Sequence, residues 1–337
     1  MSKTVKKIIC IIIAIILIAM IPISILMIKP AYNINRNYKN QTIKSADEIA
    51  GGGDYIHFLN TGGSDAILIE SNGKFAMVDA GEDSDNPRGF ENLELDGYEE
   101  KVVEYLKKNA ADENGKVHLD FVLGTHCHSD HIGGFDTVIY DKDIEIGRAY
   151  LKEYDSTKIR NKEINKWDNQ EVYDQMVRSL KAKNVPVISK PDGTPFTLGN
   201  FTITLFNTTD PENDKKVGEN DQSIGMLIEK DGTKVFLSGD MDNLTGDEDR
   251  VAPEVGKVDL LKLGHHSYHY SSTSNFIKTL LPEYCVVTNE EKSVEDRILS
   301  RVENIADSTI LITGKEDGII AEIGSNGDIQ FYNAIHN

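Results

Sequence analysis

Short stretches of alternating or continuous apolar residues recur along the chain and predict a mixed α/β fold. The predicted strands cover residues 55–60, 66–71, 74–79, 117–125, 144–151, 196–206, 223–229, 234–237, 258–263, 284–288, 309–313 and 318–323. The predicted helices cover residues 99–109, 133–140, 170–183, 275–281 and 294–302. Asn72-Gly73 and Asp231-Gly232 are strong signals for tight hairpin turns. Early hairpins followed by mixed strands and helices predict two sheets packed as a sandwich and covered by helices.

The N-terminal segment has a different pattern, because residues 8–28 are uncharged and almost wholly apolar and follow several lysines. A helix of this length, at about 1.5 Å per residue, spans a hydrocarbon core of about 30 Å. The sequence therefore predicts a basic cytoplasmic tip at 1–7, a transmembrane signal anchor at 8–28, a polar and Gly-rich linker at 29–53 and a catalytic domain at 54–337. The expected location is the cell membrane, with a single span and the catalytic domain outside the cytoplasm. Secretion after cleavage is the alternative.

One polar loop interrupts the apolar pattern, because residues 126–131 read His-Cys-His-Ser-Asp-His directly after a predicted buried strand. Alternate residues of an extended loop point to the same side, so both imidazoles of the His-x-His pair face one way and Cys127 faces the other. Imidazole nitrogen and carboxylate oxygen are ligands that zinc prefers. The sequence therefore predicts a site for one or two metal ions. Its expected ligands are His126, His128, Asp130 and His131.

Charge and cysteine content restrict the possible partners. The chain has 36 Lys and Arg against 55 Asp and Glu, a formal net charge of -19, and no dense basic stripe stands out. This composition argues against a protein whose affinity rests on neutralising a polyanion, so nucleic acid is not the expected partner. The three cysteines lie in unrelated contexts and predict no disulfide framework. No protein partner can be inferred.

The predicted strands share one further feature: four of them end in an acid or a histidine flanked by glycine. These groups are Asp79, the loop at residues 126–131, Asp240, and the pair His265 and His266. The ends of strands on one rim of a sheet meet in space even when they are distant in sequence. The sequence therefore predicts one shared site at this rim.

The order of these motifs over about residues 54–330 resembles the metallo-β-lactamase-fold hydrolases. The resemblance implies a four-layer αβ/βα sandwich with two divalent metal ions at one edge, zinc being expected and manganese the alternative. In this family pattern, His126 and His128 would hold one ion, Asp130 and His131 would hold the second, Asp240 would bridge them, and His266 would complete the second site. His265 is the alternative to His266. Asp79 would support the site from behind rather than bind metal.

One departure from the family pattern narrows the resemblance. Residues 132–239 contain no histidine or cysteine, although many members carry a further ligand there. Residues 220–223, Asn-Asp-Gln-Ser, are where a replacement polar group is expected. The gap and the His-His-Ser ending are similar to the hydrolase domain of competence-type DNA-uptake proteins and to the catalytic module of phosphorylcholine esterases. Residues 58–83 look closest to the esterases.

These features predict a metal-dependent hydrolase. Two metal ions a few ångströms apart lower the pKa of a bridging water, and the resulting hydroxide is expected to attack a phosphoester or phosphodiester. Tyr268 and His269 are candidates for stabilising the developing charge, and with Asp130 and Asp79 they complete the predicted catalytic set. The expected substrate is a small molecule or a cell-envelope component, of phosphorylcholine or nucleotide type. The alternatives are an acyl ester, a lactone or a β-lactam, or a module that binds metal or cell wall without turnover.

Overall fold

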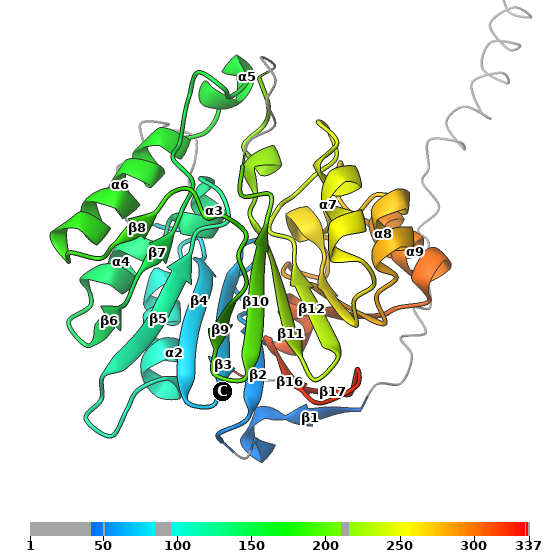
Figure 1. Cartoon of the computed structure of the whole chain (residues 1–337), viewed down its shortest axis with the longest axis horizontal. Coiled ribbons are helices and arrows are strands. Elements are labelled where there is room, and N and C mark those ends of the chain that lie inside the picture. The colour runs from blue at the N-terminus through cyan, green and yellow to red at the C-terminus, as the bar shows by residue number, and fades with distance from the viewer. Residues whose placement is uncertain (1–41, 50, 85–95, 210–215, 334, 336–337) are drawn as a thin grey trace, which may run out of the picture. The chain divides into compact units, whose positions relative to one another are not determined.

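Two β-sheets lie face to face at the centre of the structure, which is a computed structural model (Figure 1). The structure describes residues 42–49, 51–84, 96–209, 216–333 and 335. These residues belong to one unit that begins at Gln41. The sheets meet along a shared apolar core, so the predicted sandwich is confirmed at this level.

The first sheet has ten strands, and the predicted early hairpins form its centre. Its strands are β1 (Ile43–Ser45), β2 (Asp54–Phe58), β3 (Ala66–Ser71), β4 (Lys74–Ala80), β5 (Val117–Leu123), β6 (Ile144–Ile146), β7 (Ala149–Tyr150), β8 (Val187–Ile188), β16 (Ile319–Ile323) and β17 (Ile329–Asn333). The order is β1-β17-β16-β2-β3-β4-β5-β7-β8, and β6 pairs with β5. Pairing is antiparallel from β17 to β4 and parallel from β4 to β8. The C-terminal ends of β4 and β5 therefore lie at the same edge.

The second sheet has seven strands in the order β15-β14-β13-β12-β11-β10-β9. They are β9 (Phe196–Leu198), β10 (Phe201–Phe206), β11 (Gly225–Lys230), β12 (Thr233–Leu237), β13 (Leu260–Lys262), β14 (Tyr284–Val287) and β15 (Thr309–Ile312). The strands from β9 to β12 are antiparallel, and those from β12 to β15 are parallel. The ends of β12 and β13 therefore also share one edge, which positions the residues that follow them.

Helices cover the outer face of each sheet (Figure 1). The first sheet is covered by α2 (Glu99–Asn109), α4 (Phe135–Tyr140) and α6 (Asn169–Ala182), and the second by α7 (Asp247–Val255), α8 (Ser274–Leu280) and α9 (Asp296–Ala306). The shorter helices are η1 (Ala46–Glu48), α3 (Ser129–Ile132), α5 (Asn161–Ile164), η2 (Asn220–Gln222), η3 (Gly264–Ser267) and α10 (Thr313–Glu316). The result is a four-layer α/β sandwich consistent with the metallo-β-lactamase fold.

The period-two alternation of the strands explains how each sheet is covered on both faces. In β4, Val78 points into the core between the sheets, and its neighbour Met77 packs with the helix-covered cluster. In β12, Leu237 points into the same inter-sheet core. The neighbouring Phe236 faces outward, where its ring centroid lies 6.5 Å from that of Phe276 in α8. Burial on both faces accounts for the nearly continuous apolar runs of these strands.

Several element boundaries differ from the sequence-based expectation. The predicted strand at 196–206 is a tight hairpin of β9 and β10, because Gly199 has φ +55° and leaves room for the Ser71 carbonyl. The predicted strand at 144–151 is divided between β6 and β7 at Gly147. The helices α5, α7 and α10 and the strands β8 and β17 were not predicted from the sequence. Pro253 near the end of α7 weakened the helical signal there.

The stretch predicted as a linker contributes to the fold. Residues 43–45 form β1, which pairs in parallel with β17 and closes one edge of the first sheet. The turn η1 follows, with Ser45 and Glu48 forming a capping box. A strand this short has too few residues for its alternation to be recognised against a polar background.

The predicted membrane location requires correction. No helix in the part of the chain that the structure describes is long and apolar enough to cross a membrane. The predicted cytoplasmic tip at 1–7, the predicted anchor at 8–28 and most of the predicted linker lie outside the described residues.

Candidate metal centre

The ends of four strands, two from each sheet, bring the predicted site residues together. Asp79 lies at the end of β4, and the histidine loop, residues 126–131, follows β5. Asp240 follows β12, and His266 follows β13 in the turn η3. Because β4 is parallel to β5 and β12 is parallel to β13, all four ends lie at one edge of the sandwich. The structure therefore places these groups side by side, as the strand-end pattern predicts.

Three groups of side chains at this edge offer closely spaced ligand atoms. Asp65, Asp79 and His131 form one, in which His131 Nδ1 lies 2.7 Å from Asp79 Oδ2 and 3.7 Å from Asp65 Oδ2. The other two groups share Asp240. One consists of Asp130, His131, Asp240 and His266, and the other of His126, His128 and Asp240. Within each group, one potential ligand atom per residue lies within 4.8 Å of all the others. The chain therefore contains candidate residues for a binuclear metal site.

The inward-facing atoms of these residues crowd one another in a way that a cation would relieve. His126 Nε2 lies 2.9 Å from His128 Nδ1, and His131 Nε2 lies 3.1 Å from His266 Nε2. Asp240 Oδ1 is buried and lies 3.2 Å from His131 Nε2. It nevertheless forms no hydrogen bond with any of the described residues. A buried carboxylate oxygen of this kind requires a partner. Nitrogen and oxygen ligands in these numbers fit divalent metal ions such as zinc.

Asp79 orients His131 from behind. Its Oδ2 accepts a hydrogen bond from His131 Nδ1 at 2.7 Å, and its carboxylate also accepts from the Thr125 backbone N and Oγ1, both at 2.8 Å. Its backbone has φ +54°, a left-handed conformation that turns the side chain toward the histidine loop. His131 Nε2 is thereby left facing the cluster. This arrangement would allow Asp79 to support His131 from behind, which is the role that the family resemblance implies.

A strained turn positions His266. The consecutive residues His265, His266 and Ser267 have φ values of 50°, 47° and 67°, a left-handed run that is costly for side chains with a Cβ. His266 Nδ1 donates to the Thr288 carbonyl at 3.1 Å, and the Asn289 side chain donates to the His266 carbonyl at 2.9 Å. The turn therefore points His266 into the cluster, whereas His265 belongs to none of the three ligand groups.

Glu163 orients His128, and the sequence analysis did not identify it. Its Oε1 lies 3.2 Å from His128 Nε2 and accepts the Glu219 backbone N–H at 2.7 Å. With Nε2 donating to this carboxylate, His128 presents Nδ1 to His126 and the cluster. Glu163 lies on the four-residue helix α5, so no periodic signal marked it.

A buried lysine and aspartate form a second support that the sequence analysis missed. The Lys262 ammonium contacts Asp65, lies 3.6 Å from Asp240 Oδ1 and donates to the Gly239 carbonyl at 3.0 Å. Burial acts to raise the pKa of Asp65, but Lys262 and nearby histidines outweigh it and hold that pKa below its usual range. A lysine inside the apolar run that precedes His265 was the available signal.

Among the described residues, no His, Cys, Asp or Glu between 132 and 239 joins the group of His126, His128 and Asp240. From the expected stretch, Ser223 comes nearest: its Oγ lies 3.3 Å from His126 Nδ1 and accepts the Asp240 backbone N–H at 3.1 Å. Asp221 instead lies 3.3 Å from the Arg160 guanidinium. From this stretch, Ser223 therefore contacts the cluster, whereas the Asp221 side chain faces Arg160.

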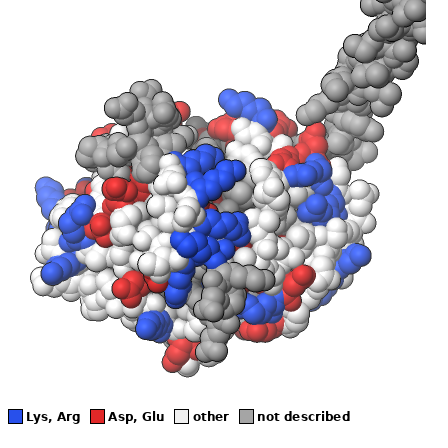
Figure 2. All heavy atoms as spheres, turned by 90° about the horizontal axis from the view of Figure 1, so that it is seen from above, with Lys and Arg blue, Asp and Glu red and all other residues white. Residues whose placement is uncertain are grey.

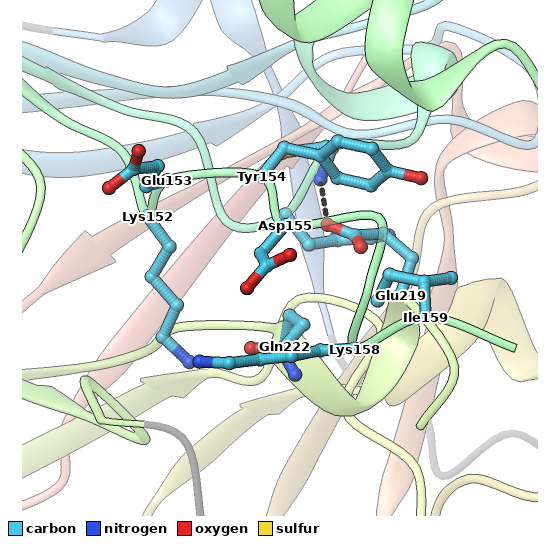
Figure 3. A pocket seen from close by; sticks show the side chains of 10 residues that line it. Lys152, Glu153, Tyr154, Asp155, Lys158, Ile159, Glu219 and Gln222 are labelled. Atoms are coloured by element: carbon cyan, nitrogen blue, oxygen red, sulfur yellow. Dashed lines mark hydrogen bonds between the residues drawn. The ribbon is translucent and has the colours of Figure 1, made fainter. Parts of the chain in front are cut away.

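Behind the histidine loop lies a small cavity of about 10 Å³ (Figure 3). Glu219 reaches the loop here, and its Oε1 accepts the Cys127 backbone N–H at 2.9 Å, the dashed line in Figure 3. Burial raises the pKa of Glu219 to about 7. It also raises the pKa of the Cys127 thiol, which belongs to none of the three ligand groups. Cys127 thus lies on the side of the loop away from the cluster.

A much larger cavity of about 740 Å³ opens on the other side of the cluster. Its walls include Asp130, Asp240, His265, His266, Tyr268 and His269. The His269 ring lies at its rim, where Nδ1 is 3.0 Å from Glu295 Oε1 and the side chain is half exposed. Tyr268 and His269 therefore border the space that a substrate would occupy, and their roles in catalysis stay predictions.

Comparison with solved structures finds only distant likenesses to this chain. None of the curated proteins compared with the chain matches its sequence. The metallo-β-lactamase-fold protein YhfI from Bacillus subtilis is 16% identical, with 77% of this chain and 96% of YhfI covered and a TM-score of 0.47. CmlA from Streptomyces venezuelae, a diiron β-hydroxylase, is 13% identical, with 78% and 53% covered and a TM-score of 0.44. Zinc-bound PqqB from Methylobacterium extorquens is 13% identical, with 77% and 87% covered and a TM-score of 0.42.

The family is established by a sequence model rather than by these distant likenesses. The model of the β-lactamase superfamily domain matches residues 93–272, which is more than half of the chain. The matched region contains the histidine loop, Asp240 and His266. The chain therefore belongs to the β-lactamase superfamily.

Proposed function

We propose that this protein is a hydrolase that uses two divalent metal ions to cleave phosphodiester or phosphoester bonds. The observation that carries the proposal is the sharing of Asp240 by two groups of potential ligands. Divalent ions at such a site lower the pKa of water toward neutrality and neutralise charge that develops on a phosphoryl group. Zinc is the expected metal, because histidine and carboxylate ligands suit it.

The residues of the chain would hold this site in one geometry. Asp79 and the Thr288 carbonyl fix the rings of His131 and His266 through their Nδ1 atoms, which keeps both Nε2 atoms toward the cluster. Lys262 offsets the buried negative charge of Asp240 before any cation is bound. Such preorganisation reduces the structural rearrangement needed during the reaction.

The Tyr268 hydroxyl and the exposed His269 are the candidates for contacting substrate, because both border the large cavity. A hydroxyl group can donate a hydrogen bond to an oxygen that gains negative charge in the transition state. The resemblance of residues 58–83 to phosphorylcholine-esterase modules supports a phosphoester substrate, either a small molecule or part of a larger polymer. The net charge of -19 argues against a long nucleic acid as the main substrate.

The test compares the zinc-loaded protein with Asp240→Ala on a panel of chromogenic substrates. The panel contains bis-p-nitrophenyl phosphate, p-nitrophenyl phosphorylcholine, p-nitrophenyl acetate and nitrocefin. Asp192→Ala removes an exposed carboxylate that neither lines the large cavity nor belongs to a ligand group, and it serves as the matched control. We expect hydrolysis of at least one phosphoester, loss of that activity in Asp240→Ala and normal activity in Asp192→Ala.

Other outcomes would identify the alternatives. Turnover of the acetate ester or of nitrocefin alone would assign the protein to acyl, lactone or β-lactam substrates. A filled metal site without turnover of any substrate would favour a binding module. Either result would contradict the proposed phosphoester hydrolysis.

A further inference from the structure

The large cavity has one strongly basic wall. Residues 158–166 read Lys-Ile-Arg-Asn-Lys-Glu-Ile-Asn-Lys, so four basic residues fall within nine positions of an otherwise acidic chain, contrary to the expectation of no dense basic stripe. Three of them, Arg160, Lys162 and Lys166, line the cavity, and we call them the basic wall. Figure 2 looks down on the end of the molecule that carries α5 in Figure 1, and lysine and arginine side chains gather near the middle of that face.

The basic wall begins beside the candidate metal centre. Glu163, between Lys162 and Lys166 in the chain, lies against His128. Trp167 follows directly, with its ring centroid 6.3 Å from that of His128 and 4.2 Å from the Lys166 ammonium. A group bound by the basic wall would therefore lie next to, but not on, the metal ligands.

The charges of the basic wall are only partly balanced. Arg160 lies 3.3 Å from Asp221, whereas no carboxylate among the described residues forms an ion pair with Lys162 or Lys166. The same cavity is also lined by six carboxylates, Glu82, Asp96, Asp130, Glu163, Asp240 and Asp242. Of these, Glu163 accepts the Glu219 backbone N–H and Glu82 accepts the Ser129 hydroxyl. Lys162 and Lys166 therefore face the cavity with their charges available.

We propose that the basic wall is a subsite for a second phosphate group, so that the preferred substrates carry one phosphate at the metal centre and another beyond it. Guanidinium and ammonium groups are the usual ligands of phosphate oxygens, and a half-buried indole adds an apolar surface for the linking part of the molecule. This inference rests on the proposed phosphoester hydrolysis for its substrate class. It adds a preference for substrates with two phosphates.

Equilibrium binding tests the subsite without requiring turnover. The probes are thymidine 3′,5′-bisphosphate and thymidine 5′-monophosphate, measured by calorimetry on the zinc-loaded protein. Lys162 and Lys166 would form two exposed ion pairs with the second phosphate. We therefore expect the bisphosphate to bind about tenfold more tightly than the monophosphate. In Lys162→Gln/Lys166→Gln we expect this preference to disappear. Lys181→Gln/Lys278→Gln, which removes the same charge from exposed sites on α6 and α8, should retain it.

A kinetic arm separates this inference from the proposed function. The substrates are the 5′-(p-nitrophenyl phosphate) of thymidine and the same ester carrying a 3′-phosphate. We expect the KM of the 3′-phosphorylated ester alone to rise about tenfold in Lys162→Gln/Lys166→Gln, with an unchanged zinc content. If the bisphosphate preference is present but neither ester is cleaved, the hydrolase proposal fails and the subsite stands. Equal binding of both nucleotides by the unaltered protein would overturn the subsite.

Discussion

At the scale of single residues, three of the four rings that face the candidate metal centre are each held by a partner behind them. Asp79 holds His131, the Thr288 carbonyl holds His266 and Glu163 holds His128. Such partners fix the ring orientation and select the nitrogen that faces the metal. The supporting residues therefore should control metal affinity as strongly as some ligands do.

Glu163→Gln tests whether a supporting residue controls metal affinity, because Glu163 holds His128 and lines the large cavity. The amide keeps the shape of the side chain but loses the charge that favours Nε2–H of His128. We expect about 10- to 100-fold weaker zinc binding by one of two sites, with the other nearly unchanged. A zinc titration followed by calorimetry resolves the two sites. Glu171→Gln, on the exposed surface of α6, is the control. Equal weakening of both sites would contradict a specific role for Glu163.

Lys262→Met tests the buried charge network. The substitution keeps most of the length of the side chain and removes the ammonium that lies against Asp65 and Asp240. Breaking a buried ion pair from one side costs about 3–5 kcal/mol, so the free energy of unfolding of the metal-free protein should fall by that amount. The double variant Lys262→Met/Asp65→Asn should recover part of the lost free energy of unfolding. Urea denaturation measures both variants, and Lys74→Met, in an exposed pair with Asp120, should change little. An unchanged stability in Lys262→Met would contradict this account.

At the scale of elements, the site depends on close approach between the end of β4 and the helix that follows the histidine loop. A Cβ atom on Gly134 would lie 2.4 Å from the Ala80 carbonyl oxygen. The Gly134 backbone thus permits α4 to start against β4, next to Asp79. The Gly-Gly after the histidine loop is therefore a packing requirement of the site.

Gly134→Ala should separate these elements. We expect a loss of about 1–3 kcal/mol in the free energy of unfolding, as is usual for overpacking. Zinc affinity should also fall, because Asp79 and His131 lie on the two segments that move apart. Thermal and urea denaturation with zinc titration provide the readout. Gly51→Ala, where nothing lies within 4 Å of the added atom, should leave both quantities unchanged. Normal zinc affinity in Gly134→Ala would show that the close approach does not position the site.

The elements also show what sequence patterns can predict. The ligand candidates of the histidine loop were recognisable because they are adjacent in sequence, and the helix at 99–109 was recognisable from its periodic apolar face. Glu163 and Lys262 were not identified, because their partners are remote in the chain and the elements that carry them are short. Local spacing therefore predicts ligands, while the groups that orient them depend on the tertiary fold.

At the scale of the whole molecule, two sheets contribute to one polar cluster. His126 and His131 follow strand β5 of the first sheet, and Asp240 and His266 follow strands β12 and β13 of the second. A cation bound by residues that follow strands of both sheets would stabilise the packing of one sheet against the other. Metal binding should therefore be linked to global stability and not only to the order of one loop.

Removal of metal should lower the melting temperature. Ligand that binds only the folded state stabilises it by about 2.7 kcal/mol when its free concentration is 100 times its Kd. Differential scanning calorimetry with and without a chelator should show this difference in the unaltered protein. The difference should shrink in Asp240→Ala, which removes the residue that two of the ligand groups share. Identical melting temperatures with and without chelator would show that no structural or catalytic metal is bound.

The most direct test of the central claim is the number of metal ions per chain, measured by native mass spectrometry after loading with zinc. The account predicts two ions in the unaltered protein, because two groups of ligands share Asp240, and fewer than two in Asp240→Ala. Two ions in both proteins would contradict the bridging role of Asp240. A metal-free protein at saturating zinc would contradict the binuclear centre itself.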